Sequence, residues 1–482
     1  MKLRLFGKNA VIYAVGSMAL RGVSFLLIPL YTHALSLSEY GMLATILLTI
    51  QILITLIDIG IRSGIIRFQT QYENENLPGT FLGSAVLLNL IGGGVVTFIT
   101  VLFFKPVFRS VLHLESVTEY ILLTCLAAVA QSLCINIMTH YRARNEGMKY
   151  MIANGAVALL LIIANVVLVL IFKEGIRGIL WALIVTYGAA WMFISIAVFM
   201  KIGFSVSYKV MRQLFVFGFP LIFAMSGDLI TGTTAVYFLS YFSNLEVVAI
   251  YSLGLKIAQI AGVMLILPFQ MAYEPFVFAN IGQSGIRETI SKLVTYLMLA
   301  FTFVGFGIVF VFKDLIYLMA PPEYAPAYNI VFLLLPGIAL MGIQYVGQSL
   351  LHIKNKTHVT GIVITGVTII SVILNYFFIQ AWGMYGVVIV FIFANLASAL
   401  ILMMLGMKQF PIRLEKRRLI QVIAIFILLM SAVFYFQNTA QIIYYSLFPF
   451  LTGMIIIFIL YGKFFENDEK IMIKSLIENR IG

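Results

Sequence analysis

Charged residues are scarce in this sequence. Only 10% of the 482 residues are Asp, Glu, Lys or Arg, whereas 62% are apolar. A soluble domain has about 25% charged and about 45–50% apolar residues, because a water-facing surface needs charge to stay soluble. The composition therefore excludes a soluble enzyme, a disordered chain and a disulfide scaffold. It predicts an all-α membrane protein that crosses the bilayer many times.

Cysteine is almost absent too. Cys125 and Cys134 fall in one apolar run, and their spacing places them about 180° apart on a helix that turns ~100° per residue. We therefore expect that the two thiols do not pair within that helix. No disulfide framework is indicated.

Motifs for catalysis and for metal or nucleotide binding are missing as well. The five histidines sit at the ends of apolar runs or in loops, and none forms a His-Glu-x-x-His pair or a Cys/His cluster. No Gly-Lys-Ser/Thr phosphate loop is present. The net charge of +12 comes from Lys and Arg residues scattered between apolar runs, not gathered into a basic domain. We expect no enzyme activity, no metal, no organic cofactor and no nucleic-acid partner.

Long apolar segments are abundant. Each could cross ~30 Å of hydrocarbon as a helix of ~20 residues, and no polar stretch between them is long enough for an extramembrane domain. We predict about 14 transmembrane helices, at residues 9–35, 41–66, 81–104, 118–139, 151–172, 178–200, 214–238, 248–273, 291–312, 328–351, 359–379, 384–406, 419–437 and 443–461.

The basic residues predict the orientation of these helices. With a cytoplasmic N-terminus, 23 of the 31 Lys and Arg residues fall in cytoplasmic loops and ends, counting Lys292 at the cytoplasmic edge of its segment, and three fall well inside segments. The external loops then carry only five, namely Lys105, Arg109, Lys173, Arg177 and Lys313. Since cytoplasmic loops of membrane proteins are enriched in Lys and Arg, this distribution favours an even number of helices with both termini in the cytoplasm.

An internal repeat recurs at an offset near 210 residues. The matching pairs are Phe6-Gly7 with Phe217-Gly218, Arg144-Asn145 with Lys354-Asn355, and Asn165, Gly175 and Gly178 with Asn375, Gly383 and Gly386. Both copies start on the same predicted side of the membrane, so the repeat is parallel. It predicts two six-helix lobes, at residues 1–205 and 206–410, with a site between them. Residues 411–482 would add a final helix pair and a cytoplasmic tail.

Ionisable residues inside the apolar segments are the candidate site residues. A charge at the bilayer centre costs at least ~2.5–3.5 kcal/mol, so each such side chain needs a partner or a wet cavity. All of them fall on the first two helices of each repeat. They are Arg21, Asp58, Arg62, Asp228, Lys256 and Glu274.

The three cations of this set favour an anionic ligand. Arg21 and Lys256 have no acid nearby on their own segments, so each could face a phosphate group. Arg62 follows Asp58 by one helical turn. These two could instead form an internal ion pair, or Arg62 could extend to the membrane interface.

The three acids are candidates for ion coupling or for counter-ions. A buried carboxylate such as Asp228 can take up a proton or help to hold Na⁺, or it can pair with Arg21 or Lys256. Asp58 offers the same chemistry. Glu274 precedes Pro275 and is either an interfacial residue or part of the site.

A series of short motifs follows the chain from residue 5 to about residue 410. They are Asn9, Arg21, Pro29-Leu30, Leu35-Ser36, Glu39-Tyr40-Gly41, Asp58-x-Gly60, Arg67-Phe68, Tyr141-Arg142-Ala143, Gly175-x-x-Gly178-x-x-Trp181, Val248-Ala249-x-Tyr251-Ser252 and the stretch from Tyr324 to Lys356. Their order, together with the predicted topology, resembles the polysaccharide-export branch of the multidrug/oligosaccharidyl-lipid/polysaccharide superfamily, which includes O-antigen flippases.

This resemblance implies two six-helix lobes around a central, often cationic cavity that is lined by the first two helices of each lobe. It implies movement of lipid-linked sugars across the cytoplasmic membrane by alternating access, commonly coupled to an H⁺ or Na⁺ gradient. Membrane lipids and glycan-assembly proteins such as a polymerase are the partners it implies. The role of a cavity cation carries over most directly to Arg21.

We therefore hypothesise a flippase for a polyprenyl-pyrophosphate-linked oligosaccharide, in which Arg21 and Lys256, with Arg62, hold the pyrophosphate. A drug or metabolite antiporter of the same superfamily is the main alternative. An exporter of cationic drugs is expected to bury acids without compensating cations. Here the apolar segments contain equal numbers of acids and cations, three of each. A membrane-embedded glycosyltransferase or polymerase is disfavoured because the predicted external loops have at most about fifteen residues.

Overall fold

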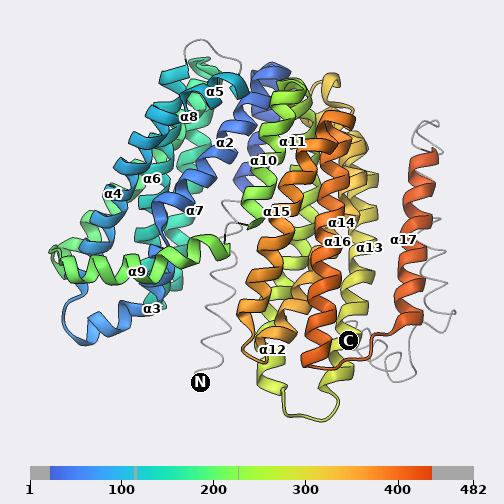
Figure 1. The fold of residues 1–482 in the computed structure, drawn as a ribbon. Coiled ribbons are helices and arrows are strands. Elements are labelled where there is room, and N and C mark those ends of the chain that lie inside the picture. The colour runs from blue at the N-terminus through green and yellow to red at the C-terminus, as the bar shows by residue number, and fades with distance from the viewer. Residues whose placement is uncertain (1–21, 113–116, 226, 437–482) are drawn as a thin grey trace, which may run out of the picture. The chain divides into compact units, whose positions relative to one another are not determined.

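The computed structural model describes residues 22–112, 117–225 and 227–436 of the chain (Figure 1). These residues form helices joined by short connections, and no strand occurs among them. Arg21 and the predicted segment at residues 443–461 lie outside the described residues.

The helices follow one another with short connections, and two π-helical turns and one 3₁₀ turn interrupt them. After the first described stretch, Gly22–Ala34, the elements are α2 (Leu37–Asp58), α3 (Ile61–Asn74), α4 (Pro78–Phe103), α5 (Lys105–Leu112), α6 (Val117–Ala143), α7 (Gly147–Asn165), η1 (Val166–Ile171), α8 (Gly175–Ile202), α9 (Tyr208–Met225), α10 (Gly227–Phe242), α11 (Leu245–Ala261), η2 (Gly262–Ile266), α12 (Leu267–Asn280), α13 (Ile286–Met319), η3 (Pro322–Tyr324), α14 (Ala327–His352), α15 (Thr357–Trp382), α16 (Met384–Gln409) and α17 (Lys416–Phe436).

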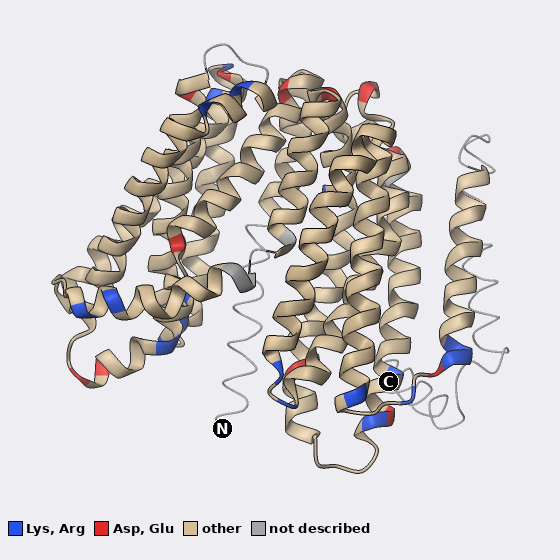
Figure 2. Ribbon diagram, viewed as in Figure 1, with Lys and Arg blue, Asp and Glu red and all other residues tan. Residues whose placement is uncertain are grey.

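Eleven stretches of the described chain are helical, apolar and long enough to cross a bilayer, and two shorter apolar helices accompany them. Figure 2 shows the charged residues gathered towards helix ends, with few between. The prediction of an all-α, multi-pass membrane protein is therefore confirmed. The number of fourteen helices stays a prediction.

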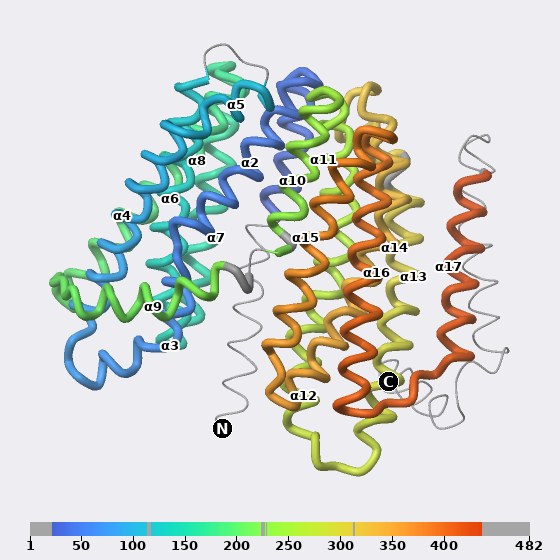
Figure 3. The backbone as a smooth tube through the Cα atoms, viewed as in Figure 1, coloured from blue at the N-terminus to red at the C-terminus, as the bar shows by residue number. Residues whose placement is uncertain are grey.

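The predicted segment at residues 214–238 is occupied by two helices, α9 and α10. Figures 1 and 3 show α9 running across α4 and α6 instead of along them. The start of α9 carries Lys209, Arg212 and Gln213, which are costly to place in hydrocarbon. An interfacial start for α9 avoids that cost.

The chain divides into two compact units. Unit 1 comprises Met1–Lys256, Ile316–Ile330 and Gly361–Ala394, and unit 2 comprises Ile257–Leu315, Val331–Thr360 and Asn395–Gly482. The lobe boundaries predicted at residues 205 and 410 stay a prediction.

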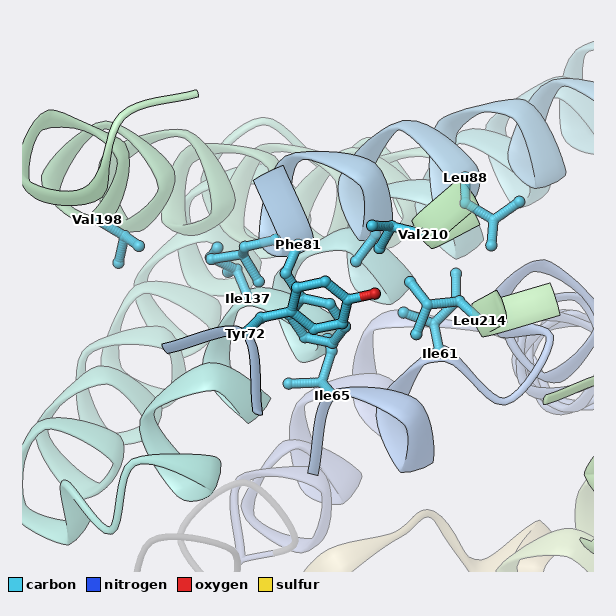
Figure 4. Packing of buried hydrophobic residues seen from close by; sticks show 11 residues of the cluster. Ile61, Ile65, Tyr72, Phe81, Leu88, Ile137, Val198, Val210 and Leu214 are labelled. Carbon is cyan, nitrogen blue, oxygen red and sulfur yellow. The ribbon is translucent and has the colours of Figure 1, made fainter. Parts of the chain in front are cut away.

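In unit 1, α6 packs against α2, α3, α4 and α8. One of its apolar clusters joins α3, α4, α6, α8 and α9 (Figure 4). The rings of Tyr72 and Phe81 stack there with centroids 4.8 Å apart, and Leu214 of α9 belongs to the same cluster as Ile61 and Ile65 of α3. This cluster holds α9 against α3.

In unit 2, a second apolar cluster joins α12, α13, α14 and α16 with the connection that precedes α17. Its buried residues are Tyr273, Val277, Ile286, Ile290, Val294, Val346, Leu350, Met403, Phe410 and Ile412. The last turns of α12 and α14 are thereby fixed in one core.

The residues matched by the internal repeat adopt matching local conformations. Asn145 and Asn355 both have left-handed backbones, with φ of 59° and 55°. Gly175 and Gly383 both have φ of 55°, a region that glycine enters at little cost. These four residues of the repeat therefore fall where the backbone turns at the start of a new helix. The arrangement of the two copies as six-helix lobes stays a prediction.

Candidate functional site

The N-terminal end of α2 is fixed by the motif that begins at Ser36. The Ser36 hydroxyl accepts the N–H of Glu39 at 3.3 Å, and the Glu39 carboxylate accepts the N–H of Ser36 at 2.8 Å. This reciprocal capping box satisfies two of the unpaired donors that a helix start leaves. A Cβ on Gly41 would overlap the carbonyl oxygen of Leu245, so glycine permits the close approach of α11.

Tyr40 of the same motif is the residue that meets Lys256. Tyr40 is 1% exposed. The Lys256 ammonium donates to the Tyr40 hydroxyl at 3.5 Å and lies 5.4 Å from the centre of its ring. The Tyr40 ring packs edge-to-face on Tyr324, with centroids 5.6 Å apart. Among the described residues, no carboxylate forms an ion pair with Lys256, so its charge is met by an aromatic ring and a hydroxyl.

The C-terminal end of α2 is a break in the helix. Ile59 and Gly60 have φ of 46° and 71°, both in the left-handed region, and α3 starts at Ile61. Gly218 of α9 lies against this break: a Cβ on Gly60 would come within 2.6 Å of the Gly218 Cα. The Asp58-x-Gly60 motif thus ends one helix, and a glycine from another helix closes over the end.

Asp58 and Arg62 form an ion pair across this break. The Arg62 Nε lies 3.2 Å from the Asp58 Oδ2, and the Asp58 side chain is 9% exposed whereas that of Arg62 is 40% exposed. Asp58 ends α2 and Arg62 lies in the first turn of α3, so each charge sits at the helix end that disfavours its sign. The ion pair offsets both effects. Of the alternatives that the sequence left open for Arg62, the structure shows the ion pair, although the two residues do not share one continuous helix.

The Asp58 carboxylate has one unused oxygen. Its Oδ1 is buried and accepts no hydrogen bond in the described part of the chain. A buried polar atom without a partner is uncommon and calls for an explanation. A proton or a small cation is the type of ligand that such an oxygen would bind.

Lys256 and Arg62 lie at opposite ends of α2. Tyr40, which Lys256 contacts, precedes Asp58 by 18 residues, and a helix rises 1.5 Å per residue. The two contact points are therefore ~27 Å apart along the helix. One diphosphate group is much shorter than this and cannot reach both cations in this arrangement.

Glu274 lies in unit 2, beside His352. The His352 Nδ1 is 3.6 Å from the Glu274 Oε1, and both side chains are partly exposed. The Tyr345 hydroxyl donates to the backbone carbonyl oxygen of Gln270, one helical turn before Glu274, at 3.5 Å. His352 was not predicted as a partner of Glu274, because α14 and α12 are separated in sequence. The one hint was that His352 ends an apolar segment.

The remaining two candidates are not fully described. Arg21 lies outside the described residues, and Asp228 is the second residue of α10 but its side chain is not described. Of the predicted site residues, only Asp58 and Arg62 contact each other among those described. Lys256 contacts Tyr40, and Glu274 contacts His352. Tyr40, which the sequence analysis named only as part of a motif, joins the candidates because it contacts Lys256.

Metal and thiol chemistry find no support in the described part of the chain. No group of three or more His, Cys, Asp or Glu side chains is arranged there to hold a metal ion. Cys125 and Cys134 are both buried and form no disulfide with a described residue.

Comparisons with known proteins give a family and a fold. The model of the family described as "Polysaccharide biosynthesis protein" matches residues 6–281, which is more than half of the chain. No curated protein matches the sequence. The solved structure of lipid II flippase MurJ in an inward closed conformation is 14% identical, with a TM-score of 0.69 over 97% of this chain and 100% of its own.

Two solved structures, each titled as a multidrug resistance MATE family transporter of the MOP superfamily, are also similar. The inward-facing one has a TM-score of 0.62 at 14% identity and covers 86% of this chain and 99% of its own. The outward-facing one has a TM-score of 0.55 at 17% identity and covers 84% of this chain and 95% of its own. At these identities the likeness shows a shared fold.

Proposed function

The chain belongs to the polysaccharide biosynthesis protein family, and on this basis we propose that it flips a polyprenyl-pyrophosphate-linked oligosaccharide across the cytoplasmic membrane by alternating access. The predicted resemblance to this branch of the superfamily is confirmed. A lipid-linked substrate is supported by the fold that the chain shares, over almost its whole length, with a lipid II flippase. A glycan polymerase is a proposed partner that would use the flipped product.

Lys256 is the observation that carries this proposal. It is a cation within an apolar helical stretch, and among the described residues it has an aromatic partner but no carboxylate. Placing such a charge in a membrane is costly, and that cost is offset when an anionic ligand approaches. A pyrophosphate supplies several acceptor oxygens for an ammonium group.

The cations of unit 1 would act at different depths. Lys256 lies near the N-terminal end of α2, which is the predicted external end, whereas Arg62 lies beyond its C-terminal end. We assign Arg62 to the pyrophosphate while the substrate is on the cytoplasmic side, and Lys256 to the later, external stage. Arg21, outside the described residues, is the further cation that we propose for this path.

Asp58 is the residue that we assign to ion coupling, with Asp228 and Glu274 as the other two candidates. The unused buried Oδ1 of Asp58 could bind H⁺ or Na⁺. Binding of the ion to Asp58 would weaken the ion pair between Asp58 and Arg62. The Arg62 guanidinium could then bind an anion. The coupling of ion and substrate would then rest on competition for one guanidinium group.

The proposal is tested by reconstitution into liposomes with a fluorescent undecaprenyl-pyrophosphate glycan. Accessibility of the sugar from outside is followed with no gradient, with an H⁺ gradient and with a Na⁺ gradient. A charged hydrogen bond contributes about 1.5–3 kcal/mol, so Lys256→Gln should slow translocation by about 10-fold to 100-fold. Lys256→Arg, which keeps the charge, should recover part of the rate.

Lys105→Gln is the matched control. Lys105 is exposed at the start of α5, and its substitution removes the same charge without touching Tyr40. Equal rates for Lys256→Gln and the wild type would overturn the role of Lys256. Efflux of a soluble cationic dye, without glycan translocation, would replace the flippase with a drug antiporter.

A further inference from the structure

Helix α9 presents an exposed face that no described segment covers. Val210, Leu214 and Gly218 of α9 are buried against unit 1. On a helix that turns ~100° per residue, the opposite face carries Tyr208, Lys209, Arg212, Phe215, Val216 and Phe219. All six are exposed, Tyr208 by 79% and Val216 by 63%. We call these six residues the α9 face.

The α9 face is cationic in its first half and apolar in its second half. The first half carries Tyr208, Lys209 and Arg212, and the second half carries Phe215, Val216 and Phe219. No acidic residue occurs between Glu174 and Asp228, and neither Lys209 nor Arg212 forms an ion pair with a described carboxylate. The cationic half of the α9 face therefore forms no ion pair within the described part of the chain. Figure 2 shows this as blue on α9 without red.

The direction of α9 fits a helix that lies in the membrane interface. Figures 1 and 3 show it running across α4 and α6, two helices long and apolar enough to span. Helices of this kind bury aromatic and aliphatic side chains at the headgroup boundary and hold anionic lipids with Lys and Arg. The Lys/Arg distribution of the sequence predicts a cytoplasmic position for the start of α9.

We propose that the α9 face binds the headgroups of anionic phospholipids in the cytoplasmic leaflet. Lys209 and Arg212 contact the phosphates, while Phe215, Val216 and Phe219 enter the upper acyl region. The burial of Gly218 against the α2–α3 break fixes α9 in unit 1, so that the bound lipids anchor this unit at the interface. This site is separate from the proposed transport of a glycan and does not depend on it.

The first test is native mass spectrometry of the full chain in detergent, with phosphatidylglycerol or phosphatidylcholine added. The double variant Lys209→Gln/Arg212→Gln should lose most of the preference for phosphatidylglycerol. Each cation near an anionic surface contributes about fivefold, so the expected loss is about 25-fold.

The matched control is Lys408→Gln/Lys416→Gln, which removes two exposed charges next to the connection between α16 and α17. This pair should change the lipid preference much less. An unchanged preference in the α9 variant, or an equal loss in the control, would overturn the proposal. An equal loss would mean that only net charge matters.

The second test needs no loss-of-charge variant. Cys125 and Cys134 are buried, so a bimane label on Val216→Cys can be attached selectively. In phosphatidylglycerol vesicles, lipids brominated near the carboxyl end of the acyl chain should quench the label. Quenching by aqueous iodide alone would place the face in water, and quenching by neither would indicate a covering protein segment. Both outcomes reject the lipid site.

Discussion

The two ends of α2 place charge in opposite ways. At the N-terminal end, Ser36 and Glu39 close a capping box, and Lys256 rests on Tyr40 without a described carboxylate. At the C-terminal end, the helix breaks at left-handed residues, and Asp58 pairs with Arg62. The N-terminal end, called the fixed end below, is a regular capped helix start beside a cation that has no described carboxylate partner. The C-terminal end, called the broken end, is an irregular backbone at which an acid and a base form a partly exposed ion pair.

This difference separates two tasks that a buried charge can have. A cation without a carboxylate can attract an anion with no ion pair to break first. A paired cation must be released before it can bind an anion, and an ion that binds the acid can release it. The fixed end of α2 therefore suits recognition, and the broken end suits coupling.

The largest expected effects come from glycines at which a Cβ would overlap backbone atoms. At the fixed end, Gly41→Ala would drive a Cβ into the Leu245 carbonyl, and at the broken end Gly218→Ala would drive one into the Ile59 carbonyl. Overpacking costs about 1–3 kcal/mol, occasionally more. We expect both variants to lower the unfolding temperature of the detergent-solubilised protein, with Gly41→Ala costing more because the capping box holds its surroundings.

Gly94→Ala is the control for this pair. Gly94 lies in α4 with no atom within 4 Å of the added Cβ, and alanine stabilises a helix by up to about 1 kcal/mol relative to glycine. The control should therefore match or exceed the wild type in stability. If Gly218→Ala is as stable as Gly94→Ala, the close contact between α9 and the break is wrong.

Local features of the sequence were enough to predict the helices and one of the site contacts. Apolar runs of ~20 residues must be helical in lipid, because every backbone group needs a partner. The pairing of Asp58 with Arg62 followed from their spacing of four residues. Both conclusions depend on neighbours along the chain, which a single sequence displays.

Contacts between distant segments could not be predicted in the same way. Lys256 and Tyr40 are separated by 216 residues, and nothing local to either marks the other. The break at Ile59 and Gly60 was hidden because Asp58-x-Gly60 lies inside an apolar run that is otherwise typical of a helix. Likewise, α9 merged with α10 into one predicted segment, since a change of helix direction leaves little trace in hydropathy.

A smaller effect is expected from the cap at the fixed end. Ser36→Ala removes the acceptor for the Glu39 N–H, and loss of such a cap costs typically ~1 kcal/mol. Ser36→Asp keeps an acceptor and should retain most of the stability. The unfolding temperature of both variants measures this difference. If both lose equally, the cap does not fix this end of α2.

The smallest expected effect is the coupling between Asp58 and Arg62, measured by a double-mutant cycle of Asp58→Asn and Arg62→Gln. Because the Arg62 side chain is 40% exposed, water screens the pair, and the coupling energy should be about 0.2–1 kcal/mol. The two single variants should nevertheless differ. Arg62→Gln leaves a carboxylate that is 9% exposed at a helix C-terminus, whereas Asp58→Asn leaves an arginine that can extend into water.

The difference between the two single variants also tests whether the Asp58–Arg62 pair couples transport to an ion gradient or only stabilises the fold. If Asp58 binds the coupling ion, Asp58→Asn should keep the fold and bind the glycan lipid while losing the dependence of transport on the H⁺ or Na⁺ gradient. Arg62→Gln should then retain that dependence at a lower rate, because the acid is still present. A variant Asp58→Asn that still responds fully to both gradients would move the coupling site away from the broken end of α2, to Asp228 or to the Glu274–His352 pair.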